Sequence, residues 1–118
     1  MKYLLLIHHE EISDEDVRRL PLLNESVQLA NDLHKKGQYV DAAPLHPASE
    51  TVTVTTREGK QFVTDGPYAE TREQIGGYFM VDVATQHEAI DIASRIPGGR
   101  LGAVEVRPVR EVEGLPKL

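Results

Sequence analysis

The chain has 118 residues and a mass of 13.1 kDa, a size that indicates one globular domain and excludes a second. Nineteen acidic and 13 basic residues give a net charge of −6 without a basic stripe, so no nucleic-acid partner is expected. The lack of cysteine excludes disulfides, thiolate metal sites and cysteine nucleophiles. The apolar run over residues 2–8 is too short for a signal peptide or a membrane span, which favours a cytoplasmic protein with no membrane partner.

The first third of the chain predicts a strand, a helix and a second strand. Residues 2–8 are apolar in both alternate sets, as expected for a strand at the centre of a sheet. A short helical turn is expected at residues 13–16, and a main helix then follows, with Pro21 in its first turn and Gly37 just past its end. Its apolar and small residues recur at helical spacing: Leu23, Ser26, Val27, Ala30, Leu33 and His34. Residues 38–43 predict the second strand.

The middle of the chain predicts a β-hairpin and a third strand. Residues 51–56 alternate strictly and are rich in β-branched side chains, and residues 61–64 return after a turn at residues 58–59. A polar stretch over residues 69–74 follows. Residues 78–83 are apolar on both alternate sets, so they predict another central strand.

The last third predicts a second helix and a closing strand. Residues 85–88 match a capping box, and apolar residues at helical spacing follow them until residues 97–99, Pro-Gly-Gly, end the helix. Residues 103–109 predict the last strand, in which Pro108 indicates a sheet edge or a strand end.

This order of elements predicts an α+β fold of the ferredoxin-like type, βαβ-hairpin-βαβ, with both helices on one face of an antiparallel sheet. Residues 1–112 are expected to form this single domain and residues 113–118 a C-terminal tail. Since the strands at residues 2–8 and 78–83 are apolar on both faces, the helix-free face would expose a large apolar patch. A homodimer that covers this face with a second copy is therefore expected.

Residues 64–78, TDGPYAETREQIGGY, resemble the signature D-G-P-F-x-E-[ST]-[KR]-E-x-[IL]-G-G of the YCII-related (YciI-like) family, in its DGPF branch. Tyr68 stands in place of the phenylalanine. The resemblance extends from the first strand through the closing strand. It implies a dimeric α+β barrel, in which two ferredoxin-like sheets face each other and each chain forms a cleft between its helices, its sheet and the motif loop.

The resemblance implies less about activity. One branch of the family includes chloromuconolactone dehalogenases, which resemble muconolactone isomerases, and DGPF members are often encoded beside extracytoplasmic-function sigma factors. In the YciI-type branch, the proposed catalytic pair is a histidine on the first helix and an aspartate just before the proline that ends the second helix. Ser26 and Ile96 occupy these positions here. The pair is absent, so its chemistry is not carried over.

The motif loop admits two interpretations. In the first, Asp65 accepts hydrogen bonds from the following turn amides and Gly66 adopts a positive φ, so that the turn closes the hairpin. In the second, the loop charges face a cleft. Glu70 or Glu73 then acts as a general base, and Arg72 binds a carboxylate.

The histidines are the other candidates. His8 and His9 precede two acidic residues, but adjacent strand residues point to opposite faces, so no metal site is predicted there. His9, at the strand end, is a candidate for proton transfer. His46 lies between two prolines on a loop that can approach the cleft. No chemistry is assigned to His34 or His87.

Two functions remain open from the sequence. The first is a small enzyme without a cofactor, which acts on an acidic or lactone-type organic molecule by proton transfer, isomerisation or dehydrohalogenation. The second is a ligand-sensing or regulatory module linked to an extracytoplasmic-function sigma factor. The predicted catalytic residues are Asp65, Glu70, Glu73 and His9, and the predicted substrate-binding residues are Arg72, His46 and Tyr68.

Overall fold

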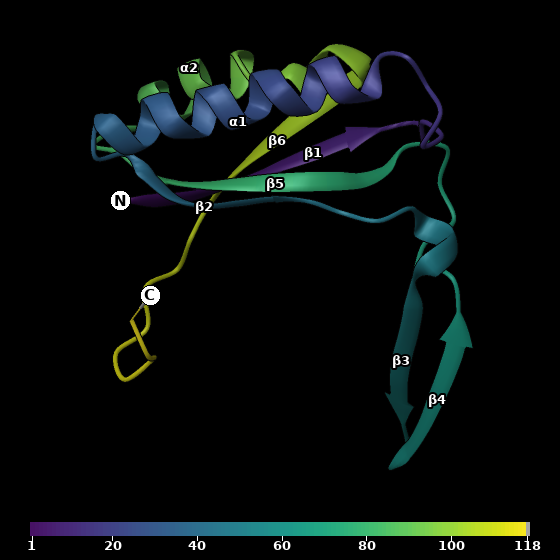
Figure 1. The fold of residues 1–118 in the computed structure, drawn as a ribbon. Helices are drawn as coiled ribbons and strands as arrows, with labels where there is room; N and C mark the ends of the chain where they lie inside the picture. Colours follow the sequence, from purple (N-terminus) through teal and green to yellow (C-terminus); the bar gives the residue numbers. More distant parts are fainter. Residues whose placement is uncertain (118) are drawn as a thin grey trace.

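A computed structural model describes residues 1–117 and shows a sheet covered by helices on one face only (Figure 1). The elements in chain order are β1 (Lys2–His9), α1 (Arg19–Lys35), β2 (Tyr39–Pro44), η1 (Ala48–Glu50), β3 (Val52–Arg57), β4 (Lys60–Asp65), β5 (Gln74–Asp82), α2 (Gln86–Ser94), η2 (Pro97–Leu101) and β6 (Gly102–Pro108). Strands β3 and β4 form a separate two-stranded sheet.

The main sheet has the strand order β2-β5-β1-β6, and each neighbouring pair is antiparallel. This is the ferredoxin-like arrangement with the hairpin inserted between its second and third strands, so the predicted fold class is confirmed. Strand β1 is central, as predicted, with Leu5 opposite both Phe79 and Val106. Strand β6, which ends at Pro108, lies at one edge of the sheet.

The core lies between the sheet and the two helices. Every second residue of β1 and β5 is buried, which is the pattern of strands with one face against a core. Both helices bury apolar residues against this face. The buried core consists of Tyr3, Leu5, Ile7, Leu29, Leu33, Phe79, Val81, Val83, Ala89, Ile92, Ala93 and Ile96.

Local signals set the ends of both helices. The carboxylate of Asp16 accepts hydrogen bonds from the guanidinium and the backbone amide of Arg18, which lower its pKa to about 2. Residues 13–16 form a turn rather than a helical turn, and α1 begins three residues later. Gly37 takes a φ of 71° after the end of α1. At the start of α2, the Thr85 hydroxyl accepts a hydrogen bond from the Glu88 amide at 3.2 Å, as the capping box predicted.

The third strand differs from the prediction, because β5 begins at Gln74 rather than at Tyr78 and includes Gly76 and Gly77. These glycines do not break the strand; they permit close packing. A Cβ on Gly77 would lie 2.8 Å from the Ala43 carbonyl oxygen of β2, and a Cβ on Gly76 would collide with the imidazole of His9. The glycine pair therefore lets one backbone and one side chain approach β5 closely.

The inserted hairpin, named here the arm (residues 52–65), projects away from the body on the helix-free side of the sheet (Figure 1). Its turn has positive φ at Glu58 (50°) and Gly59 (75°), the geometry of a type I′ hairpin. All six residues of β4 are exposed. The arm is thus a ribbon outside the core.

After β6, residues 113–117 are exposed, and Leu118 lies outside the described residues. The division into a domain of residues 1–112 and a tail stays a prediction. Neither helix in residues 1–117 is long and apolar enough to cross a membrane.

Candidate functional site

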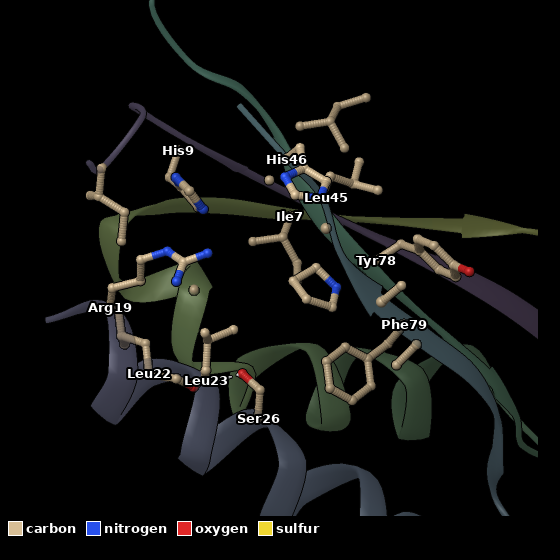
Figure 2. A pocket seen from close by; sticks show the side chains of 18 of the residues that line it. Ile7, His9, Arg19, Leu22, Leu23, Ser26, Leu45, His46, Tyr78 and Phe79 are labelled. Carbon is tan, nitrogen blue, oxygen red and sulfur yellow. Dashed lines mark hydrogen bonds between the residues drawn. The ribbon is translucent and has the colours of Figure 1, made fainter. Parts of the chain in front are cut away.

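A cleft of about 560 Å³ lies between α1 and the sheet, near the end of β1 (Figure 2). Its size falls in the range of sites for small organic molecules. Helix α1 forms one wall from Arg19 to His34, residues of β1, β2 and β5 form the opposite wall, and the segment that follows β2 borders it. Most lining side chains are apolar, among them Ile7, Leu22, Leu23, Val27, Leu45 and Phe79.

His9 supplies an imidazole to this cleft from the end of β1. Its Nδ1 lies 2.7 Å from the Glu10 carbonyl oxygen. Because a carbonyl oxygen only accepts hydrogen bonds, Nδ1 carries the proton of the neutral ring and Nε2 keeps its lone pair. The ring packs closely against Gly76, where a Cβ would lie 2.3 Å from Nε2, and within residues 1–117 Nε2 has no hydrogen-bond partner. His9 therefore has the geometry of a proton acceptor.

Arg19 supplies a cation from the first turn of α1, and Figure 2 shows its side chain extending into the cleft from the α1 side. Its Nε lies 3.5 Å from an Asp14 carboxylate oxygen, and both side chains are exposed. Such an exposed, long ion pair contributes little free energy, so the guanidinium is available to an anionic ligand.

Further polar residues line the cleft: Glu11, Asp14, Ser26, Asn31, His34, His46 and Gln74. His46 is 87% exposed, and its Nδ1 lies 3.5 Å from a Glu50 carboxylate oxygen. The Ser26 hydroxyl donates a hydrogen bond to the Leu22 carbonyl oxygen at 2.9 Å. His34, to which the sequence assigned no chemistry, packs edge-on against Tyr39.

Ser26 and Ile96, which occupy the positions of the YciI-type pair, lie in different surroundings. Ser26 faces the cleft from α1, whereas Ile96 is buried in the core. The helix position in this chain thus holds a hydroxyl that is bonded to its own helix.

The structure divides the seven predicted site residues into two groups. His9 and His46 line the cleft. The other five lie outside its lining, and their catalytic or binding roles stay predictions: Asp65, Tyr68, Glu70, Arg72 and Glu73.

Asp65 does not hold the turn in the way that was expected. Within residues 1–117 its carboxylate accepts no hydrogen bond from the amides that follow it. The Gly66 amide donates instead to the Thr51 carbonyl oxygen at 2.7 Å, and Pro67 has no N–H to donate. Gly66 does have the expected positive φ, 98°.

The remaining motif-loop side chains lie on the surface. Arg72 forms an ion pair with Glu10, the residue after His9. The Glu73 carboxylate lies beside Gly102 at the start of β6. Tyr68 is 81% exposed, and Glu70 is exposed as well. Instead of its charged residues, the motif contributes its last five residues to the cleft: Gln74, Ile75, Gly76, Gly77 and Tyr78.

Sequence reasoning missed Arg19 as a site residue. Its position relative to Leu22, Leu23 and Ser26, three, four and seven residues later, places all four on one side of α1. A basic residue on the same side of α1 as these residues could therefore have indicated a cation in the cleft.

The two adjacent histidines separate as predicted. His9 lines the cleft, whereas His8 lies on the helix-free side with its Nε2 3.3 Å from a Glu105 carboxylate oxygen. In the part of the chain that the structure describes, no three His, Asp or Glu side chains gather in a way that could hold a metal ion.

Fold and cleft together define a small ferredoxin-like α+β protein with a mostly apolar, ligand-sized site under its first helix. The chain matches the family model of the YCII-related domain over residues 1–113 and belongs to the YCII-related family. It is also similar to "Uncharacterized protein R00369" of Rhizobium meliloti (strain 1021), with 32% identity over 118 residues that cover 92% of each chain. The predicted family is confirmed.

Proposed function

We propose that the cleft binds a small, largely apolar organic molecule with an acidic group, and that His9 accepts a proton from it without the help of a cofactor. The observation that carries the proposal is the imidazole of His9, which lines the cleft and has Nδ1 held by the Glu10 carbonyl, so that Nε2 is the nitrogen able to accept a proton. We also propose, as expected from the sequence, that the chain belongs to the DGPF branch and that the protein is cytoplasmic.

The lining supports this class of ligand. The apolar walls suit a hydrocarbon or ring body, and Arg19 provides a charge-assisted hydrogen-bond donor for a carboxylate. A lactone acid, which combines a ring, a carboxylate and acidic C–H groups, has all the features that these residues can recognise. In such a molecule, Nε2 would take a proton from one ring carbon and return it to another, so the reaction consumes neither protons nor electrons.

Binding is tested with an aromatic anion, 8-anilinonaphthalene-1-sulfonate, whose fluorescence rises in apolar sites. Arg19→Gln should weaken its binding about tenfold or more, since a hydrogen bond to a charged group contributes about 1.5–3 kcal/mol. Gly76→Ala, whose new methyl group would displace His9, should also weaken binding. Unchanged affinity in both variants would place the binding site elsewhere and overturn the proposal.

Catalysis is tested with muconolactone, a lactone acid that isomerises by proton transfer. His9→Gln should slow the isomerisation about 100-fold or more, the usual contribution of a general base. His87→Gln, on the outer surface of α2, is the matched control and should leave the rate unchanged. A rate that is the same in His9→Gln would exclude His9 as the base. Cleft binding without any turnover of lactone acids would instead favour the ligand-sensing alternative.

We also propose that the protein is a homodimer joined through its helix-free sheet face. That face carries Leu4, Leu6 and Met80, which are only partly covered within one chain. A second copy would bury them. Light scattering at micromolar concentration should give twice the chain mass of 13.1 kDa, and a single-chain mass would contradict this part of the proposal.

A further inference from the structure

The arm presents apolar side chains that nothing in the same chain covers. Val52, Val54 and Val63 are 59%, 61% and 70% exposed. Val54 lies directly opposite Val63, and Val52 is two residues along the same strand, so the three share one face of the ribbon. Phe62, 52% exposed, lies on the other face. Strands β3 and β4 pack extensively against each other, and no other helix or strand of residues 1–117 packs against either of them to a comparable extent.

A two-stranded ribbon of this kind is only marginally stable in water, and both of its outer edges have unpaired backbone groups. Contact with another surface would remove the three valines from water. The question is therefore which surface the arm lies against.

The placement of the arm points to a second copy of this chain. The arm projects on the helix-free side of the sheet, so a copy seated on that face lies alongside it (Figure 1). Each arm strand has six residues and spans about 20 Å at about 3.3 Å per residue. A packed layer is about 10 Å thick, so this length matches the sheet and helix layers of one further copy. A single second copy of this chain can thus cover both the helix-free sheet face and the arm.

The charge of the arm is also consistent with a second copy of this chain as its partner. Two bases, Arg57 and Lys60, balance two acids, Glu58 and Asp65, so the arm is neutral and the net charge of −6 falls on the rest of the chain. A neutral arm can lie against a second acidic copy without repulsion. In a twofold dimer, each arm meets the other chain in the same way, which closes the assembly.

We propose that the arm clasps a second copy of this chain and packs its Val52, Val54 and Val63 face against that copy. The inference rests on the homodimer proposed above. It adds that a segment outside the sheet, inserted between β2 and β5, holds the two chains together.

Neighbouring positions on opposite faces of β4 provide the test. Val63→Asp should raise the dimer dissociation constant about tenfold or more, as expected for an interface anchor, whereas Thr64→Asp should change it less than about twofold. Both side chains are exposed in the single chain, so both variants are expected to fold. Sedimentation over a concentration series, with circular dichroism as the folding check, measures the two constants.

A crosslink separates this inference from the dimer itself. The photoreactive residue p-benzoylphenylalanine replaces Val63 in a mixture of ¹⁴N- and ¹⁵N-labelled full-length chains, and mass spectrometry identifies the joined peptides. Peptides of mixed label are expected. A dimer that Val63→Asp does not weaken, or crosslinks confined to single chains, would overturn the clasp and leave the dimer standing. A wild-type monomer would overturn both.

Discussion

The body and the arm use similar side chains in opposite ways. Strand β5 buries Phe79, Val81 and other residues against two helices, whereas β4 carries Phe62 and Val63 into solvent. The body can therefore hold a cleft with fixed geometry, in which an imidazole and a guanidinium face apolar walls. The arm instead offers apolar surface at a distance from that cleft. The contrast is between apolar residues that are buried and shape a cleft and apolar residues of the same kind that the arm leaves exposed.

A pair of truncations measures the contrast most directly. Leu33→Ala should lower the free energy of unfolding by about 2–5 kcal/mol, because Leu33 is fully buried and its removal leaves a cavity. Val54→Ala should change it by less than about 0.5 kcal/mol in the monomer, because Val54 is mostly exposed. Urea denaturation at low protein concentration gives both values. Similar losses for the two variants would show that the arm belongs to the core.

The junction between arm and body sharpens the comparison. Gly66→Ala should cost about 1 kcal/mol from backbone strain alone, since φ is 98° and no atom lies within 4 Å of the added Cβ. Glu70→Gln and Glu73→Gln, which keep the shape and remove a surface charge, should each cost less than about 0.5 kcal/mol. Thermal unfolding of the three variants measures these differences in stability. If a glutamine variant unfolds the protein and Gly66→Ala does not, the loop charges are structural.

The smallest expected effect concerns two aspartates. Hydrogen bonds from Arg18 lower the pKa of Asp16 from 3.8 to about 2, so Asp16 stabilises the fold above pH 4 and this contribution is lost as the pH falls towards 2. Asp16→Asn should therefore be less stable than the wild type at neutral pH, and the difference should shrink between pH 4 and pH 2. Asp65→Asn, at a carboxylate that accepts no turn hydrogen bond in residues 1–117, should match the wild type at pH 7. Urea midpoints across this pH range test both statements.

Most of the fold was predictable because each element carries a local pattern. The two-sided apolar run of β1, the capping box of α2 and the turn at Glu58-Gly59 all form as expected. The start of β5 was not predictable from a local pattern. Gly76 and Gly77 read as a break, and their packing against His9 and Ala43 depends on partners far away in the sequence.

The site was predicted only in part, for the same physical reason. His9 was found because it ends an apolar strand, and β1 carries it into the cleft. The charged residues of the motif loop were predicted as site residues because three of them lie within four positions. A loop, however, does not fix the direction of its side chains. Arg72 pairs with Glu10 on the surface, and Arg19, which no motif marked, supplies the cation. Placement of the cleft required the packing of α1 on the sheet.

The two glutamates after His9 connect the end of β1 to the segments at both ends of the arm. Glu10 pairs with Arg72, on the segment that leaves the arm, and Glu11 accepts a hydrogen bond from the Ala48 amide, on the segment that enters it. Both roots of the arm are thus tied to the strand end that carries the imidazole. By thermodynamic linkage, if contact with the arm changed the affinity of the cleft for a ligand, the ligand would change the affinity of the arm for its partner by the same factor. Because both contacts are exposed, that factor is limited to a few-fold, about 1 kcal/mol.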